Sequence, residues 1–103
     1  MLFRSLILLA TLETETKYGL EITKEVQDRT DGYLQFKEGT LYPALHRLEK
    51  QGFIRGEFQY LPRGGSPVKF YKLTDAGQQE LTVRRKIFNA FTKAVQNILG
   101  GNS

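Results

Sequence analysis

The repeat of apolar residues changes at Gly52, and this change limits the folds open to the chain. Before Gly52 the repeat has intervals of four and three, which is typical of one face of a helix and is carried by Leu41, Leu45 and Leu48. After it, residues 53–60 and 68–73 are rich in aromatic and β-branched residues, as strands are. We therefore expect a helix followed directly by a hairpin.

The ends of this helix and the loop of the hairpin can also be predicted. Pro43 has no N–H to donate, so it belongs near the first turn, and we expect the helix to begin within about four residues before it. Gly52 is a natural cap at the other end. The loop 61–67 carries Arg63 and two glycines, and the prolines that bound it fit strand ends.

Two further helices are predicted before this unit. Leu2, Leu6 and Leu9 recur at helical spacing, in a first helix that should end between residues 11 and 15. A second helical run opens at residues 16–19 and places one apolar face inward, made of Tyr18, Ile22 and Val26. The turn signal Asp31-Gly32 ends it, and residues 33–36 are too short a pattern to assign.

A long helix is predicted after the hairpin. Thr74 and Asp75 are N-cap candidates, the apolar repeat continues to about Leu99, and Gly100 and Gly101 close it. The fold class is therefore mainly α with a small β-hairpin. We expect a winged helix-turn-helix domain over residues 1–74, followed by a long dimerisation helix over 75–103. In such folds the third helix enters the DNA major groove.

The distribution of charge favours a polyanionic partner. The net charge is +4, and residues 37–72 hold seven basic side chains against three acidic ones. The absence of cysteine removes disulfides and thiolate metal sites, and we expect a cytoplasmic protein. No apolar run approaches the roughly 18 residues of a membrane span. The apolar opening segment has no small-residue cleavage pattern and is interpreted as a core helix.

Several segments together resemble one family of bacterial regulators. They are Tyr18-Gly19-Leu20-Glu21-Ile22, Gly39-Thr40-Leu41-Tyr42-Pro43-Ala44-Leu45-His46-Arg47-Leu48-Glu49, Gly52-Phe53-Ile54, Gly64-Gly65 and Tyr71-Lys72-Leu73-Thr74-Asp75-Ala76-Gly77. In this order they resemble the motifs of the PadR family, and the single C-terminal helix resembles its small subfamily. The resemblance implies a dimeric DNA-binding regulator, usually a repressor, that dimerises through C-terminal helices and in many cases releases DNA on binding a small molecule. Leu20 and Phe58 depart from the family pattern, so no ligand contact is carried over to them.

The face of the third helix opposite its leucines is predicted to meet DNA. We expect base contacts from its side chains and phosphate contacts from the residues that flank it and from the hairpin. The predicted DNA-binding residues are Lys37, Thr40, Tyr42, Pro43, His46, Arg47, Arg63, Gly64, Ser66 and Lys69.

Some of these residues have simpler explanations. Tyr42 has a structural alternative, in which its ring seals the first turn against the hairpin. His46 lacks the partners that a zinc site or a catalytic dyad requires, so no metal, cofactor or catalytic role is predicted for it. Gly64-Gly65 lacks the Lys-Ser/Thr of a phosphate-binding loop and is interpreted as a flexible hairpin tip.

The last helix is predicted to hold a homodimer together. Its apolar residues would leave a large exposed stripe on a monomer, unless the stripe folds back onto the first helix. The predicted dimerisation residues are Leu2, Leu6, Leu81, Phe88, Phe91, Val95, Ile98 and Leu99. The rings of Phe88 and Phe91, together with the family resemblance, suggest the hypothesis that a small aromatic effector binds at this interface.

The function expected is that of a sequence-specific regulator, a repressor by analogy, that binds double-stranded DNA as a homodimer. The alternative is a winged helix that serves only as a protein-interaction module, which predicts negligible DNA affinity. The sequence offers no nucleophile and base pair and no metal cluster, so an enzyme is not expected. The concentration of positive charge on the third helix and the hairpin favours DNA.

Overall fold

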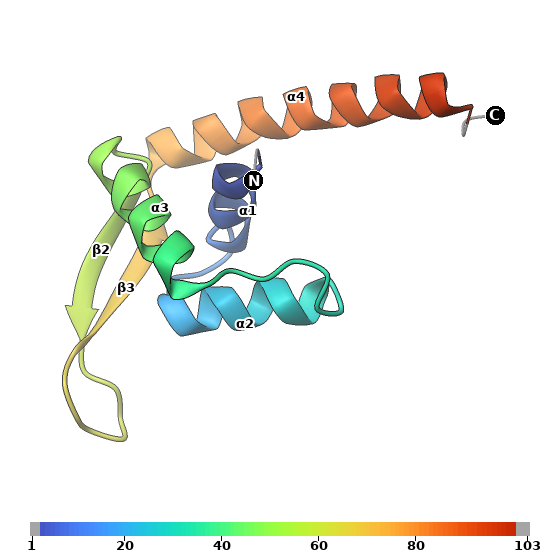
Figure 1. Ribbon diagram of the computed structural model, residues 1–103. Helices are drawn as coiled ribbons and strands as arrows, with labels where there is room; N and C mark the ends of the chain where they lie inside the picture. The colour runs from blue at the N-terminus through green and yellow to red at the C-terminus, as the bar shows by residue number, and fades with distance from the viewer. Residues whose placement is uncertain (1–2, 101–103) are drawn as a thin grey trace.

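The computed structural model describes residues 3–100, so the predictions made for Leu2 and Gly101 fall outside the described residues. The elements follow the predicted order, with one short strand in addition (Figure 1). They are α1 (Arg4–Thr11), β1 (Lys17–Tyr18), α2 (Gly19–Arg29), α3 (Glu38–Lys50), β2 (Ile54–Gln59), β3 (Val68–Leu73) and α4 (Asp75–Leu99).

The core lies where the first three helices meet the base of the sheet. It is built mainly from aliphatic side chains, each of which contributes about 1.5–3 kcal/mol when fully buried. The side chains with almost no exposed surface are Leu8, Leu9, Ile22, Leu41, Leu45, Leu48, Ile54 and Leu81. The leucine stripe of α3 is therefore confirmed as its core face.

The prediction that residues 16–19 open the second helix is wrong for Thr16, which lies outside any element, and for Lys17 and Tyr18. These two residues form β1, which pairs antiparallel with Tyr71 and Phe70 of β3 and gives the sheet the order β1-β3-β2. Tyr18 is extended and acts as the N-cap of α2, where its N–H donates to the Glu21 carboxylate at 3.1 Å. A two-residue strand is too short to show a period in the sequence.

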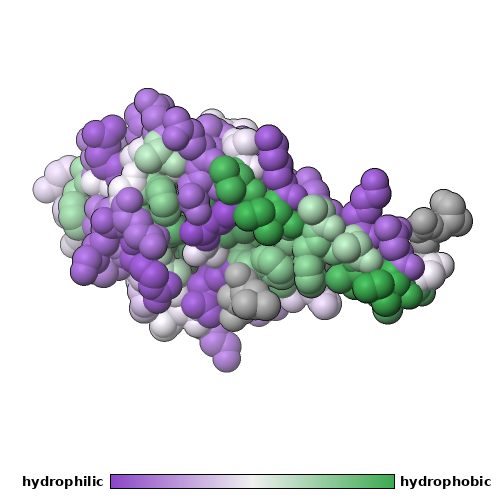
Figure 2. All heavy atoms as spheres, turned by 90° about the horizontal axis from the view of Figure 1, so that it is seen from above, coloured by the Kyte–Doolittle hydropathy of each residue, from purple (hydrophilic) through white to green (hydrophobic). Residues whose placement is uncertain are grey.

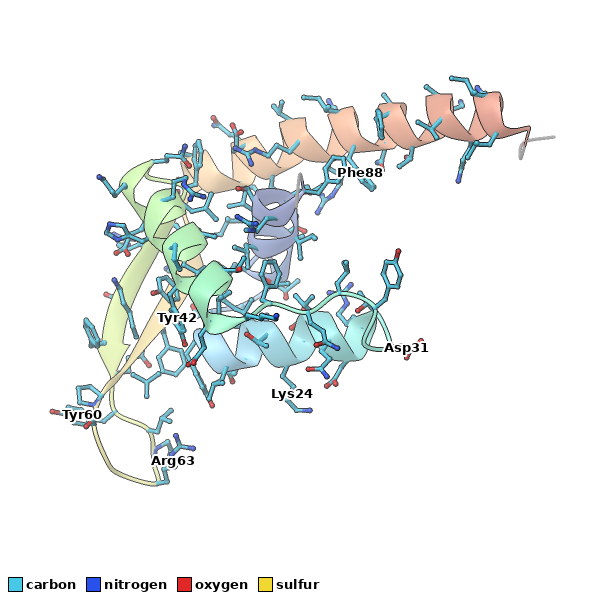
Figure 3. The ribbon with its side chains drawn as sticks, viewed as in Figure 1. Lys24, Asp31, Tyr42, Tyr60, Arg63 and Phe88 are labelled. Atoms are coloured by element: carbon cyan, nitrogen blue, oxygen red, sulfur yellow. The ribbon has the colours of Figure 1, made fainter. Side chains whose placement is uncertain are left out.

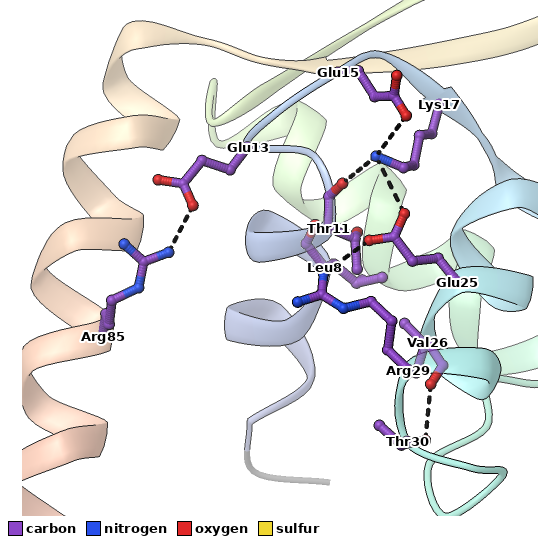
Figure 4. A network of polar contacts seen from close by, with 10 residues as sticks. All are labelled: Leu8, Thr11, Glu13, Glu15, Lys17, Glu25, Val26, Arg29, Thr30 and Arg85. Atoms are coloured by element: carbon purple, nitrogen blue, oxygen red, sulfur yellow. Dashed lines mark hydrogen bonds and ion pairs between the residues drawn. The ribbon is translucent and has the colours of Figure 1, made fainter.

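The side chain of Lys17 is buried and links three elements (Figure 4). Its Nζ donates to the Thr11 carbonyl at 2.7 Å and so satisfies a free carbonyl at the end of α1. The carboxylates of Glu25 and Glu15 lie 3.4 and 3.7 Å away and balance its charge. This arrangement ties α1, β1 and α2 together.

Both ends of α3 are well defined. It begins at Glu38, earlier than predicted, so Pro43 lies in the second turn, inside the helix. It ends in a Schellman motif, in which the N–H groups of Phe53 and Gly52 donate to the carbonyls of Leu48 and Glu49 at 3.0 Å. Gly52 has φ of 82°, a left-handed conformation that favours glycine, and its predicted capping role is confirmed.

The long helix α4 begins as predicted and lies across α1. The Thr74 hydroxyl accepts the N–H of Gly77 at 3.0 Å and donates to the Gly52 carbonyl at 2.7 Å, which joins the start of α4 to the end of α3. Figure 1 shows that the C-terminal half of α4 extends past α1, away from the wing formed by β2 and β3. Gly100 closes the helix in the left-handed conformation.

Candidate nucleic-acid interface

The solvent side of α3 carries most of the side chains predicted to meet base edges. Tyr42, Pro43, His46 and Arg47 are exposed, and Thr40 is half-buried. Within residues 3–100, the side chains of His46 and Arg47 make no hydrogen bond or ion pair, so their donors are available to a ligand. This placement follows from the leucine stripe, because a helix that buries one face must present the opposite one to solvent.

Tyr42 also has a structural role, as its alternative interpretation proposed, but its ring packs against α2 and not against the hairpin. Its ring lies against Gly19 at the start of α2, where a Cβ would come within 2.8 Å of the Tyr42 Cζ atom. The side chain is still 41% exposed. Gly19 therefore leaves room for a ring that closes the junction between α2 and α3 while keeping one edge in solvent.

The cations that flank α3 are exposed at two places. Lys37 is the N-cap residue of α3, and Arg63 lies at the tip of the wing (Figure 3). Neither side chain meets a carboxylate among the described residues. Gly64 and Gly65, with φ of 85° and 94°, give the tip a left-handed turn, and Ser66 beside them is exposed.

Lys69 differs from the other predicted phosphate ligands because its charge is already paired. Its Nζ lies 2.9 Å from the Glu49 carboxylate of α3, and also 5.5 Å from the centre of the Tyr71 ring. The hydrogen bond to Glu49 raises the pKa of Lys69 above its ordinary value. Burial likewise raises the pKa of the Tyr71 hydroxyl. In this structure Lys69 connects the wing to α3.

Gly56 makes this connection sterically feasible. A Cβ at position 56 would overlap the Lys69 side chain and lie 3.3 Å from the Glu49 carboxylate. The lysine therefore crosses β2 over a residue that has no side chain. A glycine within a predicted strand is the sequence signal that could have indicated such a close approach.

The predicted dimerisation residues divide into two groups. Leu81 is fully buried in the core of its own chain and has no surface left for a partner, which corrects its assignment. Leu6 packs partly against the same core. Phe88 is half-buried and meets the Phe3 ring edge-on, with the ring centres 4.8 Å apart. Folding back onto α1 thus accounts for part of the stripe.

The other group leaves an apolar surface along α4. Phe91, Ile98 and Leu99 are exposed, and Val95 is half-buried. Val83 and Ile87 are exposed beside them and were missed, because the predicted seven-residue repeat follows only one edge of a broader apolar arc. Figure 2 shows apolar side chains along α4 on the face opposite the rest of the molecule.

The sequence of this chain matches a known protein family. Residues 8–83 match the model of the transcriptional regulator PadR-like family. The chain belongs to the PadR-like family. A transcriptional regulator of Mycobacterium tuberculosis is 35% identical over 86 residues, which cover 84% of this chain and 73% of the relative. A protein of Lysinibacillus sphaericus, described as uncharacterized, is 38% identical over 78 residues, 76% of this chain and 70% of its own.

Solved structures agree with the PadR-like fold. A PadR family regulator from Clostridium difficile is 31% identical, with a TM-score of 0.77 over 96% of this chain and 99% of its own. A PadR family transcriptional regulator from Eggerthella lenta reaches a TM-score of 0.82 at 26% identity, over 97% and 84% of the two chains. The winged helix-turn-helix fold with a single long C-terminal helix is therefore confirmed.

Membership of the PadR-like family makes this chain a transcriptional regulator and not an enzyme. Regulators of this family bind DNA, which agrees with the exposed polar face of α3 and the basic wing tip. The described part of the chain contains no group of three or more side chains that could hold a metal ion. Across the same residues, no helix is long and apolar enough to span a bilayer.

Proposed function

We propose that this PadR-like regulator binds a pseudo-palindromic operator as a homodimer and acts as a repressor in the cytoplasm. The observation that carries the proposal is the solvent face of α3, where His46 and Arg47 are exposed and make no polar contact within residues 3–100. An Arg side chain of this kind can bind a guanine edge in the major groove with two hydrogen bonds.

The apolar arc of α4 supports the homodimer. Phe91 is 55% exposed and Ile98 84% exposed, and the part of the helix that carries them extends beyond the chain's own core (Figure 1). A contiguous apolar stripe of this length favours association with an identical stripe around a two-fold axis. Such a dimer presents two copies of α3, and we expect half-sites about 34 Å apart, one turn of DNA.

An apolar groove supports control by a small aromatic molecule. It runs between α1 and α2, encloses about 490 Å³, and reaches Phe88 at the edge of the proposed dimer interface. Binding there would alter how α4 rests on α1 and hence the spacing of the two α3 helices. Calorimetric titration with a panel of aromatic compounds, followed by DNA binding with any compound that binds, tests this hypothesis. A panel with no effect on DNA affinity would count against it.

The deciding experiment for DNA recognition is fluorescence anisotropy with two labelled duplexes. One duplex carries the region upstream of the protein's own coding sequence, and the other has the same composition in scrambled order. We expect a preference of about 10³ or more for the first duplex that persists at higher salt. Equal binding to both duplexes that is lost at higher salt would indicate only non-specific attraction to a basic surface. Weak binding to both duplexes would favour a protein-interaction module.

A further inference from the structure

Phe58 is an exposed aromatic side chain on the wing, and packing in the core does not account for it. It lies in β2, is 68% exposed, and contributes nothing to the buried core. Tyr60, just beyond the end of β2, is 75% exposed. An exposed ring of this kind is available to a partner, and a Phe side chain contributes about 1.5–3 kcal/mol when it is fully buried.

The strand register shows which side of the wing Phe58 occupies. Phe58 pairs with Lys69, and Gly56 pairs with Tyr71. Residues at paired and alternate positions share one face of a sheet. Lys69 on this face bonds to Glu49 of α3, and its Nζ lies 5.8 Å from the centre of the Phe58 ring. Phe58 therefore lies on the side of the wing that faces α3.

The charges around Phe58 suit a polyanion. The one wing carboxylate, Glu57, pairs with Phe70 and so lies on the opposite face. On the side of Phe58, the charge of Glu49 is balanced by Lys69 at 2.9 Å. The loop that follows carries Arg63, which forms no ion pair with any described residue. Neither Glu57 nor Glu49 therefore presents an unpaired negative charge beside the Phe58 ring.

We propose that Phe58 packs against the deoxyribose rings of the DNA backbone beside the groove that α3 enters. This inference rests on the proposed function. The sugar edges offer apolar C–H groups between the phosphates, and an aromatic ring that covers them gains affinity by excluding water. Such a contact neutralises no phosphate and releases no counterion, so its contribution is independent of salt.

The first test compares Phe58→Ala with Tyr33→Ala by anisotropy on the upstream and scrambled duplexes over a range of salt. Tyr33 is 87% exposed, and it follows Asp31, which Figure 3 places at the far end of α2 from the wing. We expect Phe58→Ala to weaken binding about tenfold on both duplexes with an unchanged salt slope, and Tyr33→Ala to have no effect. Wild-type affinity of Phe58→Ala would overturn the inference and favour a protein contact for the ring.

A second variant tests the contact directly. The chain contains no tryptophan, so Phe58→Trp introduces a single fluorescent reporter at this position. We expect this variant to keep its DNA affinity and its emission to shift or be quenched when DNA is added. Binding without any change in emission would place position 58 away from the DNA and would contradict the inference.

Two controls separate this inference from the proposed function. Circular dichroism of Phe58→Ala should match the unmodified chain, because the ring is mostly in solvent. If the unmodified chain prefers the upstream duplex and Arg47→Ala loses that preference while Phe58→Ala binds normally, the proposed function stands and the role of Phe58 is refuted. If the unmodified chain binds neither duplex, the proposed function fails and the inference fails with it.

Discussion

Lys69 Nζ of β3 lies 2.9 Å from Glu49 Oε1 of α3, across Gly56 of β2. This ion pair fixes the wing against α3, at a point where both side chains are about two-thirds covered. It holds the two parts of the proposed interface at one angle, and it keeps one lysine of the wing from acting as a free cation.

Replacing the acid tests this connection. Glu49→Gln keeps the size of the side chain and loses the charge, so we expect the free energy of unfolding to fall by about 1 kcal/mol. The released Lys69 should also reach phosphate and steepen the salt dependence of DNA binding by about one ion. Urea unfolding and salt titrations measure these effects. Glu57→Gln is the matched control on the opposite face, and an equal response from both variants would refute the assignment.

The carboxylate of Glu13 makes stability depend on acid pH. It accepts hydrogen bonds from Arg85 at 2.7 Å and Gln78 at 3.1 Å, joining α4 to the loop after α1 (Figure 4 shows the first). The bond from Arg85 is the main cause that lowers its pKa from 4.5. Because the pKa of Glu13 is lower in the folded than in the unfolded chain, the ionised carboxylate stabilises the fold. This contribution to the free energy of unfolding is fully present above the unfolded pKa and is lost as the pH falls through the folded pKa.

Glu13→Gln should therefore be less stable than the unmodified chain near neutral pH, and this difference should shrink as the pH falls. Urea midpoints of both proteins between about pH 7 and about pH 3 measure it. A difference that stays constant over this range would show that the Glu13 charge contributes nothing.

Gly77 allows the start of α4 to rest on the end of α3. A Cβ at this position would overlap the backbone carbonyl of Phe53 and lie 2.8 Å from Leu73 Cδ1. A backbone carbonyl cannot move aside as a flexible side chain can, so we expect Gly77→Ala to cost about 2 kcal/mol or more. Gly39→Ala, with open space around its Cβ, should instead stabilise α3 by about 0.5–1 kcal/mol. Thermal unfolding compares them, and equal melting temperatures would contradict the prediction.

Arg47 and Arg63 should contribute to DNA binding in different ways. Arg47→Ala removes a side chain on the solvent side of α3, and we expect a loss of about 1–3 kcal/mol in binding to the operator alone. Arg63→Ala removes a wing-tip cation and should weaken operator and scrambled DNA alike, with the salt slope reduced by about one. Anisotropy at several salt concentrations separates these outcomes. Operator affinity unchanged in both variants would exclude this mode of docking.

The exposed edge of α4 should control the oligomeric state. Phe91→Lys places a charge in the apolar arc, and we expect the dimer to dissociate at micromolar concentration. Asn89→Lys adds the same charge on the polar side of the helix and should leave the dimer intact. Sedimentation velocity distinguishes the two variants. If Phe91→Lys is still a dimer, the dimer interface does not include this part of α4.

Local signals in the sequence determined most of the secondary structure. Three signals are local: the leucine spacing of α3, the cap at Thr74 and the left-handed Gly52. Each depends on residues only a few positions away in the chain, so its pattern is visible without knowledge of the fold. The same is true of the wing, since the segments that form its strands are rich in aromatic and β-branched residues and its prolines lie outside the strands. The exposed polar face of α3 followed directly from its buried one.

Only the tertiary structure decided the features that depend on partners distant along the chain. The strand at Lys17–Tyr18 exists because β3 offers it hydrogen bonds, and Leu81 is buried because the start of α4 packs into the core built by the other elements. Lys69 is held by Glu49, 20 residues earlier, so the sequence showed a wing cation but not that its charge was already paired. A period or a cap is set by neighbours in the chain, whereas burial and ion pairing are set by neighbours in space.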